Sequence, residues 1–234
     1  MRLSRALVVL LALAASSCAS YRTPGAPARL LDADPAEVRE GARQPSPEFP
    51  LTLAVVRVQA GDYRSASTIG SHRGSFSVVS DAQLFDKAQL KTIAGWPRVE
   101  GAALLDTALL PEQLNAIDEL RLAAAKMQAD VLVVYTVATQ FARGDSAYAP
   151  LAKLPLDDQS AELRLRTLVS AVLVDVRTGY NYGAVQAEAG AAVAAKARTP
   201  QALDAQRLEV ERLALERFLQ AGEQQWAQLL RRYQ

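Results

Sequence analysis

The sequence predicts an α/β (α+β) domain: a mixed β-sheet of about five strands, helices packed mainly on one face, and a long C-terminal helix. Short apolar, β-branched runs alternate along the chain with segments whose apolar residues recur every three or four positions. Two runs, 130–137 and 163–176, are apolar over most of their length, which is typical of strands inside a sheet. Thr199 and Pro200 are typical of the N-cap and first position of a helix, and they predict the start of the last helix.

The domain is predicted to begin at Leu51. Residues 51–58 are apolar and β-branched and predict a strand, whereas the Gly- and Ser-rich segment 61–74 predicts a loop. Residues 75–79 predict a second, short strand.

A helix is expected next, starting at Ser80. Ser80 and Gln83 have the spacing of a capping box, in which the two side chains satisfy backbone N–H groups reciprocally. The apolar face of this helix would consist of Leu84, Phe85, Ala88 and Ile93. Residues 95–97, Gly-Trp-Pro, should end it, and residues 99–105 predict another strand.

The clearest helical periodicity runs from Pro111 to about Gln128. Its apolar stripe is Leu110, Leu114, Ile117, Leu120, Ala124 and Met127. The following run, 130–137, is apolar at nearly every position and should therefore be a central strand with both faces covered. Residues 141–160 contain Asp, Pro and Gly and predict a long loop.

A long hairpin and a helix complete the predicted domain. Residues 163–176 form the first strand, 177–179 (Arg-Thr-Gly) the turn, and 180–189 the antiparallel return. Thr199 and Pro200 are typical N-cap and first residues of a helix. The apolar side of that helix is Leu208, Leu215, Phe218, Leu219, Trp226 and Leu229.

The N-terminus has the organisation of a secretory signal. Arg2 and Arg5 are followed by ten apolar residues, 6–15, and then by small residues. An apolar run of this length is too short to span a bilayer. We therefore expect a signal peptide over 1–17, a flexible Pro-rich tether over 18–50 and the folded domain over 51–234.

Cys18, the only cysteine, follows this signal directly. Residues 15–18, Ala-Ser-Ser-Cys, resemble the lipobox of bacterial lipoproteins, in which the cysteine is acylated and becomes the mature N-terminus. By the same resemblance, Ala19 in place of Asp implies the outer membrane, with the domain facing the periplasm. The alternative is a secreted protein with an incidental free cysteine.

The charge balance excludes one class of partner. Without Arg2 and Arg5 the mature chain has 24 basic and 25 acidic residues and no dense basic stripe, so nucleic acid is not an expected partner. Once its cysteine is acylated the chain can form no disulfide, and its stability must come from packing.

No residue pattern predicts catalysis, a metal site or a cofactor. His72 is the only histidine, it lies outside any zinc-binding spacing, and a solvated loop position is expected for it. Asp157 and Asp158, with Asp145 upstream, could bind a hard cation, but no calcium-loop pattern surrounds them and a solvated acidic loop is favoured. The sequence therefore predicts a non-enzyme.

Three further features concern possible binding surfaces and the hairpin turn. Tyr180 and Tyr182 alternate with Asn181, should project to one face, and are a possible binding surface, although tyrosines that cover a sheet are the commoner case. Asp175 and Arg177 flank the hairpin turn and are expected to orient it. The stripe on the last helix predicts core packing, with a groove-binding or self-associating helix as the alternative.

Two segments carry a family resemblance. Leu120–Thr136 (LRLAAAKMQADVLVVYT) and Ser170–Tyr180 (SAVLVDVRTGY) are similar to signatures of uncharacterised bacterial outer-membrane lipoproteins. They also resemble the curli-secretion lipoprotein and the N-terminal domain of the Tol translocation protein. The resemblance implies a mixed sheet with helices mainly on one side, and it implies no catalytic residue.

The expected function is therefore that of a periplasmic lipoprotein, held in the membrane by acylated Cys18, which binds an envelope protein as a non-enzymatic accessory factor. The alternative is a structural subunit of an envelope assembly or secretion complex. If that complex were a pore, its subunits would need hairpins that enter the membrane, with apolar and polar residues in alternation. The candidate segment is 141–160, where charged residues interrupt this alternation.

Overall fold

The computed structural model of the protein describes residues 20–30, 44–46, 48–80, 84–158, 161–194 and 198–233. Its strands are β1 (Ser20–Arg22), β2 (Leu51–Ala60), β3 (Arg73–Gly74), β4 (Phe76–Val78), β5 (Val99–Leu104), β6 (Gln113–Leu114), β7 (Val131–Arg143), β8 (Ser146–Ala147), β9 (Lys153–Pro155), β10 (Leu163–Asp175) and β11 (Asn181–Val193). Its α-helices are α2 (Lys87–Ala94), α3 (Ile117–Lys126) and α4 (Pro200–Leu230). The structure confirms the predicted α+β class.

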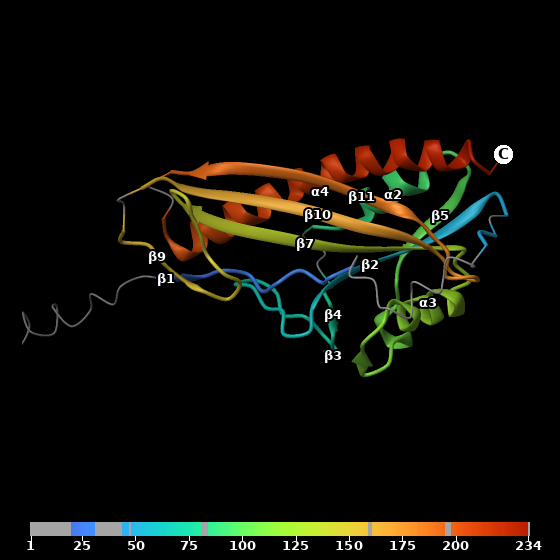
Figure 1. The fold of residues 1–234 in the computed structure, drawn as a ribbon, viewed down its shortest axis with the longest axis horizontal. Coiled ribbons are helices and arrows are strands. Elements are labelled where there is room, and N and C mark those ends of the chain that lie inside the picture. The colour runs from blue at the N-terminus through green and yellow to red at the C-terminus, as the bar shows by residue number, and fades with distance from the viewer. Residues whose placement is uncertain are drawn as a thin grey trace, which may run out of the picture.

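The main sheet is mixed and has the order β11-β10-β7-β2-β4, with β5 also on β2 and β8 on β7. β2 pairs in parallel with β5 and β7, whereas β10 pairs antiparallel with both β7 and β11. Strands β7, β10 and β11 each have 13 residues and extend beyond β2 (Figure 1). The long hairpin is confirmed, with a positive φ of 75° at Gly179 in its turn.

β7 is central, as predicted, because its first half is covered on both faces. Val133 and Tyr135 point into one apolar core, together with α2 and α4. Leu132 and Val134 point into a second core, together with α3. Figure 1 shows α2 and α4 along one side of the sheet and α3 on the other, so most of the helical mass covers one face.

α4 has 31 residues and lies along the whole sheet, about 46 Å at 1.5 Å per residue. The side chain of Thr199 accepts a hydrogen bond from the N–H of Ala202, which confirms the predicted N-cap. Trp226 is fully buried, and its indole N–H donates to the carbonyl of Pro97 (2.8 Å). The predicted stripe on this helix is core, with Leu215, Phe218, Leu219, Trp226 and Leu229 buried and Leu208 partly buried.

Two helix starts differ from the predictions. The capping box of α2 consists of Asp86 and Gln89, and Leu84 and Phe85 are buried just before the helix. The box predicted at Ser80 and Gln83 includes Gln83, which lies outside the described residues. α3 begins at Ile117 rather than at Pro111, because residues 113–114 pair with β3 instead. For α3, a long-range strand pairing thus takes the residues where the helix was predicted to start.

The prediction of a flexible tether over 18–50 does not hold for residues 20–30. β1 pairs antiparallel with β9, and Tyr21 is 2% exposed in the core, where its ring lies 5.4 Å from that of Phe141. Further along, the N–H of Ala28 donates to the hydroxyl of Thr136 (2.9 Å). The folded domain therefore includes residues 20–30 as well as the predicted range. Cys18 lies outside the described residues.

The predicted long loop, 141–160, is largely packed onto the domain. β7 extends to Arg143, β8 returns beside it, and β9 pairs with β1. Phe141 and Leu154 are fully buried, and Leu156 is 4% exposed. The apolar side chains of this segment therefore pack in the core of the domain.

Candidate functional site

One side of the main sheet is partly exposed. α3 covers the sheet only near the hairpin turn. Beyond it, the N-terminal segment borders the side of β7 that points away from α4, and the same side of β10 and β11 is exposed or half-buried. We call this surface the open face. It consists of Ala138, Gln140, Ala142, Arg164, Arg166, Leu168, Ser170, Ala184, Gln186, Glu188, Gly190 and Ala192, all exposed or half-buried.

Two adjoining grooves lie on the open face, and both are lined by Gln140 and Arg166. The first has a volume of about 570 Å³ and is lined in addition by Arg164, Glu188 and Arg217. This groove is charged, with two further arginines beside a single glutamate.

The second groove has a volume of about 350 Å³ and is more apolar in character, with Pro27, Tyr148, Pro150 and Leu168 in its lining. The N-terminal segment forms one of its walls, and this wall is held by hydrogen bonds. The N–H of Ala28 donates to the hydroxyl of Thr136 on β7 (2.9 Å), and the carbonyl of Ala26 accepts from the N–H of Ala60 on β2 (3.2 Å). The groove is thus built by segments distant in sequence.

Arg166 and Glu188 form an ion pair across the open face, with Nε of Arg166 3.0 Å from Oε2 of Glu188. Both side chains are more than half exposed, so the pair contributes at most about 1 kcal/mol to folding. A charged ligand could therefore exchange with either partner at low cost.

The edge of β11 is partly covered by α4. Arg217 donates to the carbonyl of Glu188 (2.8 Å), and Gln206 donates to the carbonyl of Ala192 (3.0 Å). These contacts reduce the capacity of the edge strand to pair with another chain. The open face, rather than the strand edge, is the available surface.

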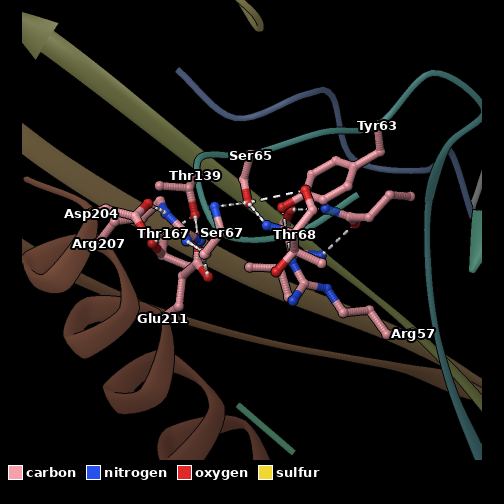
Figure 2. A network of polar contacts seen from close by, with 12 residues as sticks. Arg57, Tyr63, Ser65, Ser67, Thr68, Thr139, Thr167, Asp204, Arg207 and Glu211 are labelled. Carbon is pink, nitrogen blue, oxygen red and sulfur yellow. Dashed lines mark hydrogen bonds and ion pairs between the residues drawn. The ribbon is translucent and has the colours of Figure 1, made fainter. Parts of the chain in front are cut away.

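A buried polar network on the opposite side of the sheet joins four parts of the chain (Figure 2). Arg207 and Glu211 on α4 are each 1% exposed, and Nη1 of Arg207 lies 2.7 Å from Oε2 of Glu211. Nε of Arg207 donates to Asp204 (2.9 Å), and its Nη2 donates to the hydroxyl of Ser67 (2.7 Å). Thr139 on β7 donates to Glu211 (2.7 Å).

The network is saturated, which favours a structural role. All three guanidinium nitrogens of Arg207 have partners, and Tyr21 donates its hydroxyl proton to Asp204 (3.0 Å). Burial would lower the pKa of Arg207, but the charge of Glu211 and the contact with Asp204 hold the pKa above its ordinary value. For Tyr21, burial itself raises the pKa. Both the guanidinium of Arg207 and the hydroxyl of Tyr21 therefore keep their protonated forms.

The tyrosines singled out in the sequence lie together beside the C-terminal end of α4. The rings of Tyr180 and Tyr182 are 5.3 Å apart, and the ring of Tyr233 is 5.8 Å from that of Tyr182. Tyr182 is only 6% exposed and donates its hydroxyl proton to Asp175 (2.7 Å), so it has almost no surface to offer a ligand. Tyr180 is half-buried against the same core.

Asp175 orients the hairpin turn, as predicted. Its side chain accepts hydrogen bonds from the N–H of Thr178 (2.7 Å) and the N–H of Ser46 (3.0 Å), besides that from Tyr182. Burial alone would raise the pKa of Asp175, but these hydrogen bonds together hold the pKa below its ordinary value. Arg177 is exposed and lies 3.6 Å from Glu48.

Asp175→Asn is therefore expected to lower the free energy of unfolding at pH 7 by about 1.5–3 kcal/mol, the range for hydrogen bonds to a charged group. Because the folded pKa is the lower one, this stabilisation is complete above the unfolded pKa, about 4, and is lost as the pH falls through the folded value. Urea denaturation at pH 7 and pH 3 should show the difference shrinking in acid. Asp118→Asn, at an exposed carboxylate, is the control, and an equal cost for both variants would contradict this account.

The other candidate residues stay apart. His72 is half-exposed in a turn with a φ of 70°, and its Nδ1 lies 3.0 Å from the hydroxyl of Ser71. Asp145 and Asp157 are exposed, and Asp158 forms an ion pair with Arg143. Within the described ranges, no group of three or more His, Cys, Asp or Glu side chains could hold a metal ion.

The described helices include none that is long and apolar enough to cross a membrane. A search of protein-family models finds no match to this chain, and a search of curated proteins finds none either.

Proposed function

We propose that this protein is an envelope lipoprotein, anchored in the outer membrane through acylated Cys18, whose periplasmic domain binds a protein partner as a non-enzymatic accessory factor. The geometry that supports binding is the open face with its two adjoining grooves. The sequence features that support anchoring are the signal-like segment 1–17 and the position of the single cysteine directly after it.

Exposure alone does not support a binding role, since antiparallel sheets commonly have one face in solvent. The open face is not a uniformly polar surface, however. An apolar groove with Tyr148 and Leu168 adjoins a charged groove with Arg164 and Arg217. This combination suits a protein segment that presents an apolar side chain beside an acidic one, because the first would be desolvated and the second paired.

The alternative of a pore subunit required residues 141–160 to form a membrane hairpin. In the described part of the chain this segment instead supplies Phe141 and Leu154 to the core and β9 to the pairing with β1. Releasing it would expose these side chains and open that pairing. A binding role therefore fits the fold better than a pore.

The test is affinity purification from solubilised envelopes with three forms of the full chain. Gln140 lines both grooves, so Gln140→Trp should fill their common border and reduce recovery of a partner about tenfold or more, as loss of a central contact does. Gln113→Trp is the matched control, at an exposed strand position outside both grooves, and should behave as wild type. Recovery of no consistent partner across several detergents, or an equal effect of both variants, would count against the proposal.

A further inference from the structure

We propose that the outer face of the β1–β9 pair is the surface through which the domain rests on the membrane, where it binds anionic phospholipid headgroups. The outer face consists of the exposed side chains Ser20, Arg22, Lys153 and Pro155. The inference rests on the proposed acylation of Cys18 and adds to it an orientation of the domain and a lipid class.

The first argument is chain length. Only Ala19 lies between Cys18 and Ser20. A fully extended chain spans at most about 3.5 Å per residue, so the two steps place the Cα atom of Ser20 within about 7 Å of that of the acylated residue. Ser20 is paired with Pro155, and its neighbour Tyr21 is 2% exposed in the core. The domain therefore cannot withdraw from the bilayer unless this buried side chain is pulled out.

The second argument is charge. Arg22 and Lys153 lie directly opposite each other in the antiparallel pairing, an arrangement that is unfavourable for like charges unless an anion neutralises it. Neither side chain forms an ion pair with another described residue, and neither strand contains an acidic residue. Two acidic residues follow β9: Asp158 forms an ion pair with Arg143, and Asp157 is exposed. A basic residue near an anionic membrane surface strengthens binding by about fivefold.

The orientation also places the candidate binding site. β1 and β9 lie at the end of the molecule where β7 stops and β10 starts, and the hairpin turn lies at the opposite end (Figure 1). β10 alone has 13 residues, about 40 Å at 3.3 Å per residue, so the turn projects away from the bilayer. Gly25 and Tyr148 line the apolar groove. Gly25 comes shortly after β1 and Tyr148 shortly before β9, so a partner in this groove would bind near the membrane surface.

The test uses acylated full-length protein in vesicles of phosphatidylcholine and phosphatidylglycerol that contain a lipid with a quencher on its headgroup. Because Cys18 is the only cysteine and its thiol is acylated, a single fluorophore can be attached at Pro155→Cys or, as the distant control, at Arg177→Cys. We expect several-fold stronger quenching at position 155 than at 177. Equal quenching at the two positions would overturn the orientation, since a domain on a long tether has no preferred face.

A second arm tests the headgroup contact. Lys153→Glu places opposite charges across the pair, so the fold should be retained, which thermal unfolding followed by circular dichroism verifies. This change should weaken quenching at position 155 in phosphatidylglycerol vesicles and leave it unchanged in pure phosphatidylcholine. Lys126→Glu, at an exposed residue of α3, is the matched control. Identical quenching in both variants would overturn the lipid preference.

Failure of the anchor itself gives a different result. If wild-type protein takes up no radiolabelled palmitate and does not float with vesicles, while Cys18→Ser behaves identically, the proposed function loses its anchor and the orientation falls with it. If wild type is labelled and floats but the two fluorophores are quenched equally, only the orientation is wrong.

Discussion

Replacing Glu211 with glutamine is expected to lower the free energy of unfolding by about 3 kcal/mol or more, the cost of breaking a buried ion pair from one side. Arg207 would keep its charge at 1% exposure, and the carboxylate that receives two of its hydrogen bonds would be gone. Thr139 would also lose a charged acceptor. Urea denaturation at pH 7 measures the change.

A matched control lies on the same helix. Glu209 pairs with Arg212 on the exposed side of α4, where Glu209→Gln should change stability by no more than about 0.5 kcal/mol. The double variant Arg207→Met, Glu211→Leu removes both charges and should recover most of the loss, because apolar residues can replace a buried pair. If Glu211→Gln and Glu209→Gln had equal effects, the buried network would not contribute as the structure indicates.

The sequence predicted the elements whose signal is local. The strand at 130–137 was recognisable because both of its faces are apolar, and α4 because Thr199 and Pro200 mark its start. Asp175 and Gly179 likewise specify the hairpin turn through contacts within a few residues. In each case the sequence signal lies within the element or within a few residues of it, so the local pattern predicts the structure.

Elements defined by distant partners were missed. β1 has three residues, too few for a period-two pattern, and its partner β9 lies some 130 residues away, within a predicted loop. The prolines around it are typical of a tether, and Tyr21 alone gave no sign that it is buried. The packing of residues 20–30 follows from the tertiary fold, which no local pattern encodes.

The candidate sites also divide into features that have a local sequence pattern and features that depend on the tertiary fold. Arg164 and Arg166 alternate with apolar residues along β10, and these arginines lie on the open face. The grooves depend on Pro27 and Tyr148, which only the tertiary fold brings beside β10. Arg207 and Glu211 have helical i, i+4 spacing, but such pairs are usually exposed, so their sequence gave no reason to expect burial.

Tyr21→Ala is expected to lower the free energy of unfolding by about 3–5 kcal/mol, the usual cost of removing a buried aromatic ring. The ring packs against Phe141 at 5.4 Å, and its hydroxyl donates to Asp204 in the network around Arg207. The substitution should also release β1 from β9, since Tyr21 is the only buried residue of that strand. Urea denaturation measures the loss, and limited proteolysis should show earlier cleavage between residues 20 and 30.

Tyr21→Phe separates the two contributions. It keeps the ring and removes only the hydrogen bond to Asp204, so a loss of about 1 kcal/mol is expected. Ser20→Ala, at the exposed neighbouring position, should leave stability unchanged. If residues 18–50 were a flexible tether throughout, Tyr21→Ala would be as neutral as Ser20→Ala. A large difference between these two substitutions would instead establish that the folded domain begins within two residues of Cys18, with no slack between the domain and the proposed acylation site.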